Sequence, residues 1–316
     1  MALSLVRLNC VKSLFIAIVL FIIAGGTVAY SSEGGGNTYT LGYFGVLTGI
    51  QPPPGEYFTE VTIDYSGNAV FETQSGEVET HTHINSFSAA SIFQQVTKTR
   101  VLNSDYAWGI LASVVNNDVS GQVVRPVNIP SFNASITGLG TVVLLPMALG
   151  WNNGRSHQRI ALIVYTPLGN YNVKRLVSTC TNHWSYEFDY AFTFKDPKTG
   201  LEFTVVPGYT INTINRATNY RDGQELHIDF SAIKNFPTSF GFGITGYAFN
   251  QTTPDSGSGA LLGAFKGRVY ALGPTFVYDA KVGGETISLI GKYFQEFGAQ
   301  NRFEGHSAWL YMTIAF

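Results

Sequence analysis

Residues 305–316 read GHSAWLYMTIAF and end the chain on an aromatic residue. Ala308, Leu310, Met312 and Ile314 alternate with the other face, which is typical of an extended strand with one apolar side. Soluble domains seldom end this way, because chain termini are usually polar and frayed. The pattern favours a bacterial outer-membrane β-barrel, whose last strand closes the barrel and whose terminal aromatic, here Phe316, is expected to be the assembly signal. The alternative is a soluble β-sandwich.

The beginning of the chain predicts export. Residues 1–29 are expected to be a signal peptide, with Arg7 and Lys12 ahead of an apolar run over 14–24 and a small-residue cleavage site at 27–29. That run is shorter than the roughly 20 residues that a spanning helix needs, and no later stretch resembles a membrane helix. A mature chain embedded in a membrane must therefore be a closed barrel, which satisfies its backbone groups in lipid.

Composition agrees with a membrane barrel. Only 13% of the residues are charged and 14% are aromatic, whereas roughly 25% are charged in ordinary soluble domains. Without Arg7 and Lys12, the 19 basic residues become 17 against 21 acidic ones. The sequence has no basic patch, which excludes nucleic acid as a partner. Cys180 is the only cysteine after residue 29, so no intramolecular disulfide is expected, and the sequence predicts no cofactor.

Residues 57–316 are predicted to form an all-β, transmembrane, antiparallel up-and-down β-barrel of about twelve strands. Short connections alternate with long ones along this part of the chain, as in barrels with tight periplasmic turns and long outside loops. The long connections are expected at 67–83, 118–138, 167–181, 213–223, 251–263 and 298–305. The strands are expected at 57–66, 84–100, 105–117, 139–150, 157–166, 182–194, 201–212, 224–233, 239–250, 264–279, 285–297 and 306–316.

Residues 30–56 precede the first expected strand and allow two interpretations. Residues 31–37 are rich in Ser and Gly, and Pro52-Pro53-Pro54-Gly55 stiffens an extended approach to the strand. The segment either leads from the periplasm into the barrel or folds partly into the lumen as a plug.

Five short stretches resemble an outer-membrane barrel family named for a meta-pathway of phenol degradation. They are residues 52–57 (PPPGEY), Gly138-Leu139-Gly140 followed by Leu145-Pro146, residues 166–171 (TPLGNY), residues 218–227 (TNYRDGQELH) and Gly273-Pro274. Their order spans nearly all of the mature chain. This sequence has Thr141 where the family usually has Asp, so any role of that Asp at the barrel wall is in doubt here. The resemblance implies uptake of phenol-like aromatics, through association with a pathway.

The alternation places polar residues on the expected lumen face. They serve either as a constriction that selects solutes by charge and hydrogen bonding, or as an ion-pair network that fills a largely packed interior and braces the wall. The lumen candidates are Glu60, Asp64, Arg159, Glu187, Asp189, Glu225, His227, Asp229, Lys266 and Arg268.

Neither catalysis nor a metal site is expected. His306, Ser307 and Glu304 suggest an envelope hydrolase, but neighbours on a strand point to opposite faces, so His306 and Ser307 cannot pair without a bulge. His81 and His83 have the spacing of a weak metal site, for which a solvated outside loop is the better interpretation.

The sequence therefore predicts an outer-membrane barrel that passes or binds small hydrophobic or aromatic compounds as a passive channel. The alternatives are a plugged barrel with a structural or adhesive role and, less favoured, an envelope hydrolase. The expected partners are outer-membrane lipid and lipopolysaccharide, the barrel assembly machinery and a small hydrophobic solute.

Overall fold

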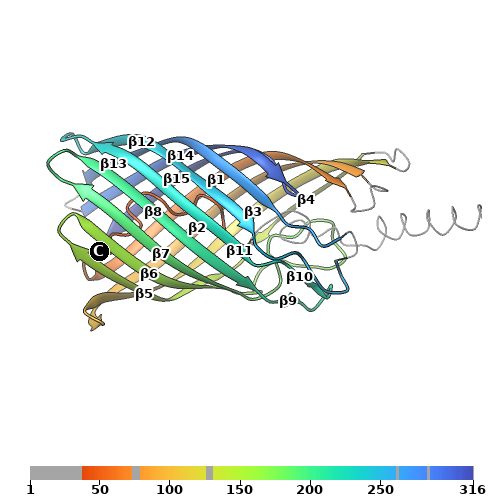
Figure 1. Ribbon diagram of the computed structural model, residues 1–316, viewed down its shortest axis with the longest axis horizontal. Coiled ribbons are helices and arrows are strands. Elements are labelled where there is room, and N and C mark those ends of the chain that lie inside the picture. The colour runs from red at the N-terminus through yellow and green to blue at the C-terminus, as the bar shows by residue number, and fades with distance from the viewer. Residues whose placement is uncertain (1–37, 73–78, 126–130, 261–262, 283–284, 316) are drawn as a thin grey trace, which may run out of the picture.

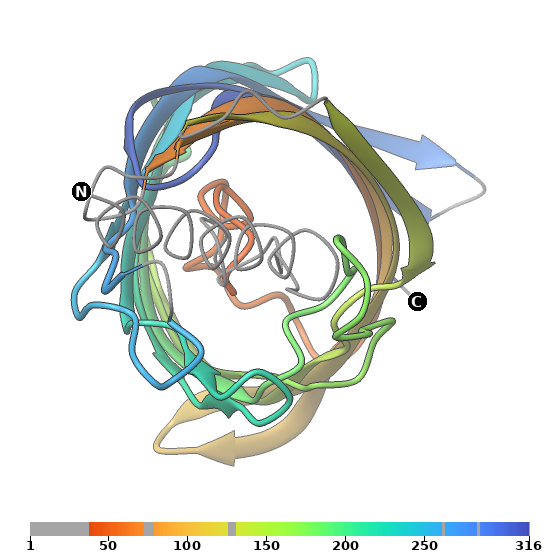
Figure 2. The same ribbon diagram turned by 90° about the vertical axis from the view of Figure 1, so that its right-hand side faces the viewer.

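The computed structural model describes residues 38–72, 79–125, 131–260, 263–282 and 285–315. Within them, twelve antiparallel strands close into a barrel when β4 and β5 are counted as two halves of one strand (Figures 1 and 2). This confirms the predicted fold class. The strands are β1 (Gly55–Glu72), β2 (Glu79–Val101), β3 (Ser104–Arg125), β4 (Phe132–Leu139), β5 (Val143–Asn153), β6 (Ser156–Tyr165), β7 (Ser185–Asp196), β8 (Leu201–Asn212), β11 (Glu225–Asn235), β12 (Phe240–Gln251), β13 (Arg268–Val282), β14 (Glu285–Gln300) and β15 (Glu304–Ala315).

The seam between the first and last strands closes the barrel. β15 pairs with β1 from Tyr57 opposite Ala315 to Asn68 opposite Glu304. Trp309 lies opposite Ile63, and both side chains are on the inner face. Of the described residues, none belongs to a helix long and apolar enough to cross a membrane.

The two ends of the barrel differ. Tight connections join β2 to β3, β5 to β6, β7 to β8, β11 to β12 and β13 to β14 at one end, called here the turn end. The other connections are mostly longer and meet at the opposite, loop end, which also carries the small hairpin of β9 (Ile214–Asn215) and β10 (Tyr220–Arg221) (Figure 1). In outer-membrane barrels the short turns face the periplasm.

The first three strands are longer than the sequence suggested. Residues expected in the long connections 67–83 and 118–138 are largely strand, with β1 pairing to β2 as far as Glu72 opposite Glu79. Ala69, Ile84 and Val119 pack together on the inner face of this extension. Many of its outward residues are polar. Because polar stretches are typical of loops, the continued alternation of inner and outer residues was not recognised as strand.

The fourth strand is interrupted at residues 140–142, between β4 and β5. Gly140 N donates to the carbonyl of Ser113, whereas Val142 N donates to that of Leu168 in the loop after β6. The pairing of β5 with β6 shifts register between Leu144 and Met147. Pro146 lies in this interval and has no N–H to donate to the neighbouring strand. The break and the shift explain the weak alternation of this stretch.

The outer surface carries a broad apolar band. On β7, Tyr186, Phe188 and Tyr190 point outward, while Glu187 and Asp189 point inward. Large exposed apolar side chains continue this band on other strands, for example Val205, Ile228, Ile244 and Leu310. Such a band suits a surface in contact with hydrocarbon.

Candidate functional site: a lumen divided by the segment before the first strand

Residues 38–51, called here the luminal segment, lie inside the barrel (Figure 2). At the loop end, Thr38 Oγ1 donates to Asn212 Oδ1 over 3.1 Å. At the turn end, Asn152 Nδ2 donates to the carbonyl of Gln51 over 2.7 Å. The described chain thus runs down the lumen from the loop end before β1 begins at the turn end. The expected course of residues 30–37, and the signal peptide at 1–29, lie outside the described residues.

One side of the lumen binds the luminal segment through carboxylates. Thr38 N donates to the carboxylate of Glu225 at 3.3 and 3.4 Å, Gly42 N donates to Asp229 Oδ1 at 3.1 Å, and Leu47 N donates to Glu202 Oε1 at 3.3 Å. A carboxylate acceptor makes such bonds stronger than neutral ones. The wall therefore satisfies backbone groups that this irregular segment does not satisfy internally.

Lys292 of β14 holds the middle of the luminal segment. Its Nζ donates to the carbonyls of Gly42, Tyr43 and Phe44 at 2.9, 3.0 and 2.7 Å. Tyr311 donates its hydroxyl to the carbonyl of Tyr43 at 2.8 Å, and its ring lies 4.7 Å from the Lys292 ammonium. Gly42 adopts φ +90°, and a Cβ there would lie 2.7 Å from the Phe294 ring, so this turn requires glycine.

The other side of the lumen is apolar and leaves a cavity of about 410 Å³ beside the luminal segment. Arg159 and Lys292 are the only charged side chains among the described residues that line it. The barrel wall contributes small, apolar or hydroxyl-bearing side chains from β1, β2, β3, β5 and β6. They include Thr59, Val61, Ile63, Ser88, Ala90, Ile92, Gly109, Leu111, Ser113, Val115, Val143, Leu145 and Ile163.

Acidic side chains surround His227 on the polar side. Its Nδ1 lies 2.6 Å from Asp229 Oδ2, and its Nε2 lies 3.4 Å from Glu187 Oε1 and 3.5 Å from Asp189 Oδ1. Tyr39 of the luminal segment covers the imidazole with a ring stack. Tyr39, Leu41 and Phe44 belong to the same buried cluster as the wall aromatics.

The structure brings six of the ten lumen candidates to the inner face. Arg159 lines the cavity, and the others form the polar wall: Glu187, Asp189, Glu225, His227 and Asp229.

The other four candidates were wrong. Asp64 and Arg268 are exposed on outward positions of β1 and β13, and Glu60 is also outward, accepting a hydrogen bond from Ser91 Oγ at 2.6 Å. Lys266 is exposed in the loop before β13. For Glu60, Asp64 and Arg268 the assignment failed because it placed the polar face of every strand inside, whereas one side of this lumen is apolar; for Lys266 it failed because β13 begins only at Arg268.

Sequence reasoning missed Lys292, Glu202 and Glu296, which are all buried on the inner face. On β14, Lys292, Phe294 and Glu296 share the inner face, while Tyr293 and Phe297 are exposed on the other. Both faces mix polar and aromatic residues, so alternation alone does not distinguish them. The luminal segment is held largely through its backbone, which leaves little trace in the sequence.

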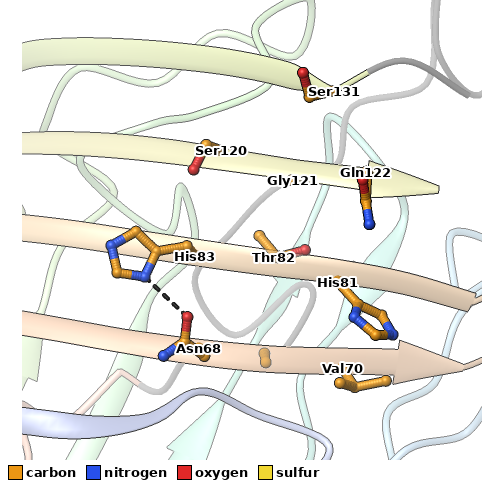
Figure 3. Close-up of a pocket in the computed structure, with 10 residues that line it drawn as sticks. Asn68, Val70, His81, Thr82, His83, Ser120, Gly121, Gln122 and Ser131 are labelled. Atoms are coloured by element: carbon orange, nitrogen blue, oxygen red, sulfur yellow. Dashed lines mark hydrogen bonds between the residues drawn. The ribbon is translucent and has the colours of Figure 1, made fainter. Parts of the chain in front are cut away.

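The histidines considered for catalysis or metal binding are placed as follows. His306 is exposed, whereas Ser307 is buried and accepts a hydrogen bond from Trp309 Nε1, so the two do not pair. His81 and His83 lie on β2, not in a loop as expected, beside a pocket over β1 to β3 (Figure 3). His81 Nε2 is 2.7 Å from Glu79 Oε1, and His83 Nδ1 is 3.0 Å from Asn68 Oδ1.

Three connections are fastened together at the loop end. His183 Nε2, before β7, lies 2.8 Å from Asp222 Oδ2, after β10. Burial lowers the pKa of His183, but the Asp222 carboxylate outweighs it, so the pKa is raised above its usual value. Asp255, after β12, accepts hydrogen bonds from Tyr220 Oη at 2.6 Å and Gly223 N at 3.0 Å, and burial raises its pKa.

The comparisons with known proteins agree with this architecture. An outer membrane channel from Pseudomonas putida F1 matches with a TM-score of 0.64 and 10% identity, covering 85% of this chain and 98% of that chain. The transport unit of the autotransporter AIDA-I from Escherichia coli matches with a TM-score of 0.42 and 11% identity, covering 87% of this chain and 93% of that chain. At 10% identity the likeness to the channel shows the fold alone, and the match to the autotransporter, with its lower TM-score, adds nothing to it. No curated protein matches the sequence.

A family model described as "Putative MetA-pathway of phenol degradation" matches residues 67–312. That range takes in all of the strands from β2 to β14. The closed twelve-strand barrel and its apolar outer band are those of a protein of the bacterial outer membrane. The chain is an outer-membrane β-barrel, and it belongs to the family that carries this description.

Proposed function

We propose that this barrel passes small hydrophobic or aromatic compounds across the outer membrane by passive diffusion along the apolar side of its lumen. The observation that carries the proposal is the cavity of about 410 Å³ between the luminal segment and a wall formed by β1, β2, β3, β5 and β6, with a few residues of β14 and β15. The family description, which names phenol degradation, and the similar fold of an outer membrane channel support it.

The cavity lining suits such solutes. Burial of an apolar ring gains roughly 25 cal/mol for each Å² removed from water, and Ile92, Leu111 and Val143 offer that surface. The hydroxyls of Ser88 and Ser113 also line the cavity and are able to bond a phenolic hydroxyl. A few polar groups on an apolar surface allow entry without the strong binding that would prevent release.

The test uses two adjacent alanines of β2. Ala90 lines the cavity, whereas its neighbour Ala89 lies on the opposite, outer face. Ala90→Trp should lower uptake of a radiolabelled phenol by cells at least severalfold, and Ala89→Trp should leave it unchanged. Outer-membrane levels of both variants are measured by the heat-modifiable gel shift. Equal uptake by both folded variants would refute the proposed route.

A plugged barrel with a structural or adhesive role is the second candidate. The bonds from Lys292 and three wall carboxylates to the luminal segment favour it, because they fasten the segment at several points. A barrel of this kind passes neither ions in planar bilayers nor labelled phenol into cells. Transport by the wild type, blocked by Ala90→Trp, would exclude it.

The partner interactions belong to the same proposal. Lipid and lipopolysaccharide would contact the outer apolar band, and the barrel assembly machinery would read Phe316, which lies outside the described residues.

A further inference from the structure

Three side chains of the polar wall bring one nitrogen and two carboxylates to a common point. They are Glu187 and Asp189 of β7 and His227 of β11, and their ligand atoms all lie within 4.8 Å of one another. We propose that these three residues bind a divalent first-row transition-metal ion, with Zn²⁺ as the best fit. This proposal does not rest on the transport route, since none of the three residues lines its cavity; Tyr165, which donates to Glu187, does line it.

The spacing suits a tetrahedral ion. Ligands held about 2.0–2.1 Å from a tetrahedral Zn²⁺ are roughly 3.4 Å apart. His227 Nε2 is 3.4 Å from Glu187 Oε1 and 3.5 Å from Asp189 Oδ1. Imidazole and carboxylate without thiolate are ligands that Zn²⁺, Mn²⁺ and Fe²⁺ accept.

Apart from the long contacts of 3.4 and 3.5 Å among themselves, the atoms that face the common point have no hydrogen-bond partner. They are Glu187 Oε1, both carboxylate oxygens of Asp189, and His227 Nε2. These residues are buried, with 0%, 6% and 1% of their surfaces exposed. Unpaired buried acceptors are costly, because folding removes their water without a replacement. An ion at the common point would satisfy all three side chains.

The remaining atoms of Glu187 and His227 are fixed by other groups. Glu187 Oε2 accepts from Tyr165 Oη at 2.9 Å and from Thr210 Oγ1 at 3.0 Å. His227 Nδ1 lies 2.6 Å from Asp229 Oδ2. Because a carboxylate can only accept, Nδ1–H of a neutral imidazole donates the hydrogen bond to Asp229, and the lone pair of Nε2 points toward the other two acids. Metal-binding histidines are oriented by carboxylates in this way.

A glycine leaves the space between the ligands. Gly208 of β8 is paired with Asp189 on one side and with His227 on the other. A Cβ at position 208 would collide with His227 Nε2 and Asp189 Oδ1. The two side chains therefore converge over a position where any other residue would occupy the gap.

The competing interpretation is a protonated His227 held by ion pairs. With the buried Arg159 of the neighbouring β6 counted, whose charge acts on Asp189, a protonated His227 against Glu187, Asp189 and Asp229 leaves a net charge of −1, whereas a divalent ion with neutral imidazole leaves 0. Arg159 on the neighbouring β6 makes no hydrogen bond with either Asp189 oxygen. Buried uncompensated charge is strongly unfavourable, so the ion neutralises this wall better than the proton does.

The experiment uses the full-length barrel, untagged, folded in detergent and stripped with a chelator. Co²⁺ is titrated and followed by its visible absorption, and Zn²⁺ is measured by competition. The wild type should bind one equivalent. Asp189→Asn, which removes a ligand charge, and Gly208→Ala, which fills the gap, should each weaken binding at least tenfold.

Two controls separate this site from others. Glu296→Gln alters a buried luminal carboxylate whose oxygens already accept from Tyr65, Tyr247 and Gly305, and it should bind as the wild type does. The double variant His81→Ala/His83→Ala removes the outer histidines and should also bind normally. Folding of each variant is checked by the heat-modifiable gel shift.

Three results would overturn the assignment. They are no stoichiometric binding by the stripped wild type, undiminished binding by Asp189→Asn, or loss of binding in the double histidine variant alone. If Asp189→Asn fails to fold, Glu187→Gln replaces it with the same expectation. Absent or undiminished binding would leave the cluster as an ion-pair network around a protonated histidine.

Discussion

Tyr39 of the luminal segment stacks face to face on His227 of β11, with ring centroids 3.7 Å apart and planes inclined by 13°. Phe44 extends the stack, at 5.7 Å from Tyr39. Asp229, which orients His227, also accepts from Gly42 N of the segment. Wall chemistry and the position of the segment are therefore linked through a few shared side chains.

Lys292→Met should free the luminal segment. Hydrogen bonds to a charged group contribute about 1.5–3 kcal/mol each, and this substitution removes the donor for the carbonyls of Gly42, Tyr43 and Phe44. Single-channel conductance in planar bilayers should rise severalfold. Lys281→Met, at an exposed position near the turn end, is the control and should conduct like the wild type. Unchanged conductance in both would mean that other contacts suffice to hold the segment.

The outer face predicts a contrast between β11 and β1. Ile228→Arg places a charge on the apolar band and should cost roughly 2–4 kcal/mol near the bilayer midplane. Thr62→Arg should cost much less, because Glu60 and Asp64 flank it on the same outward face. Unfolding by urea in liposomes measures both. Equal losses of unfolding free energy would argue against an outward position for the two acids.

The loop-end contact between His183 and Asp222 predicts pH dependence. The pKa of His183 is raised above its usual value, which is about 6.5, despite burial and because of Asp222. Protonated His183 therefore stabilises the folded loop below about pH 6.5, and this stabilisation is lost as the pH rises through the folded-state pKa and His183 becomes neutral.

Trypsin cleavage in this loop, at the exposed Arg175, should therefore quicken with rising pH more in the wild type than in His183→Gln. The variant controls for the pH response of the protease itself. Parallel profiles for the two proteins would remove His183 as the cause.

Cys180 provides a native reporter of the cavity that it helps to line. It is 3% exposed, and burial raises the pKa of its thiol. A neutral maleimide should label it faster than a sulfonated one, and both should be slow compared with labelling of Ser256→Cys on the exposed loop. Added phenol should protect Cys180 alone. Equal rates for the two reagents would indicate an aqueous rather than an apolar path.

The sequence was most informative where the two faces of a strand differ in polarity. On β7 and β11 the inner acids and outer aromatics were both predictable, and the structure places Glu187, Asp189 and Asp229 inside. On β1 the same rule assigned the inner and outer faces the wrong way round, because Val61 and Ile63 face an apolar lumen and Glu60 faces out. Alternation reveals the period of a strand, but the contents of the lumen decide which face is inner.

The luminal segment was harder to predict for a different reason. Thr38, Gly42 and Leu47 contact the wall through backbone N–H groups, which every residue except proline possesses. Lys292 likewise binds carbonyls rather than particular side chains. Recognition of this kind depends on shape and position, so it leaves no motif that a reader of the sequence is able to find.

The luminal segment passes along the axis of a closed barrel. The strand pairing of β1 with β15 closes the barrel around residues 38–51. The segment therefore cannot leave through the wall unless two strands separate. The segment can leave the lumen only by moving along the barrel axis. The segment continues into Gly55 at the turn end, which makes that end the fixed point of the tether. A force that withdraws Thr38 from the loop end must therefore act from the turn end of the barrel.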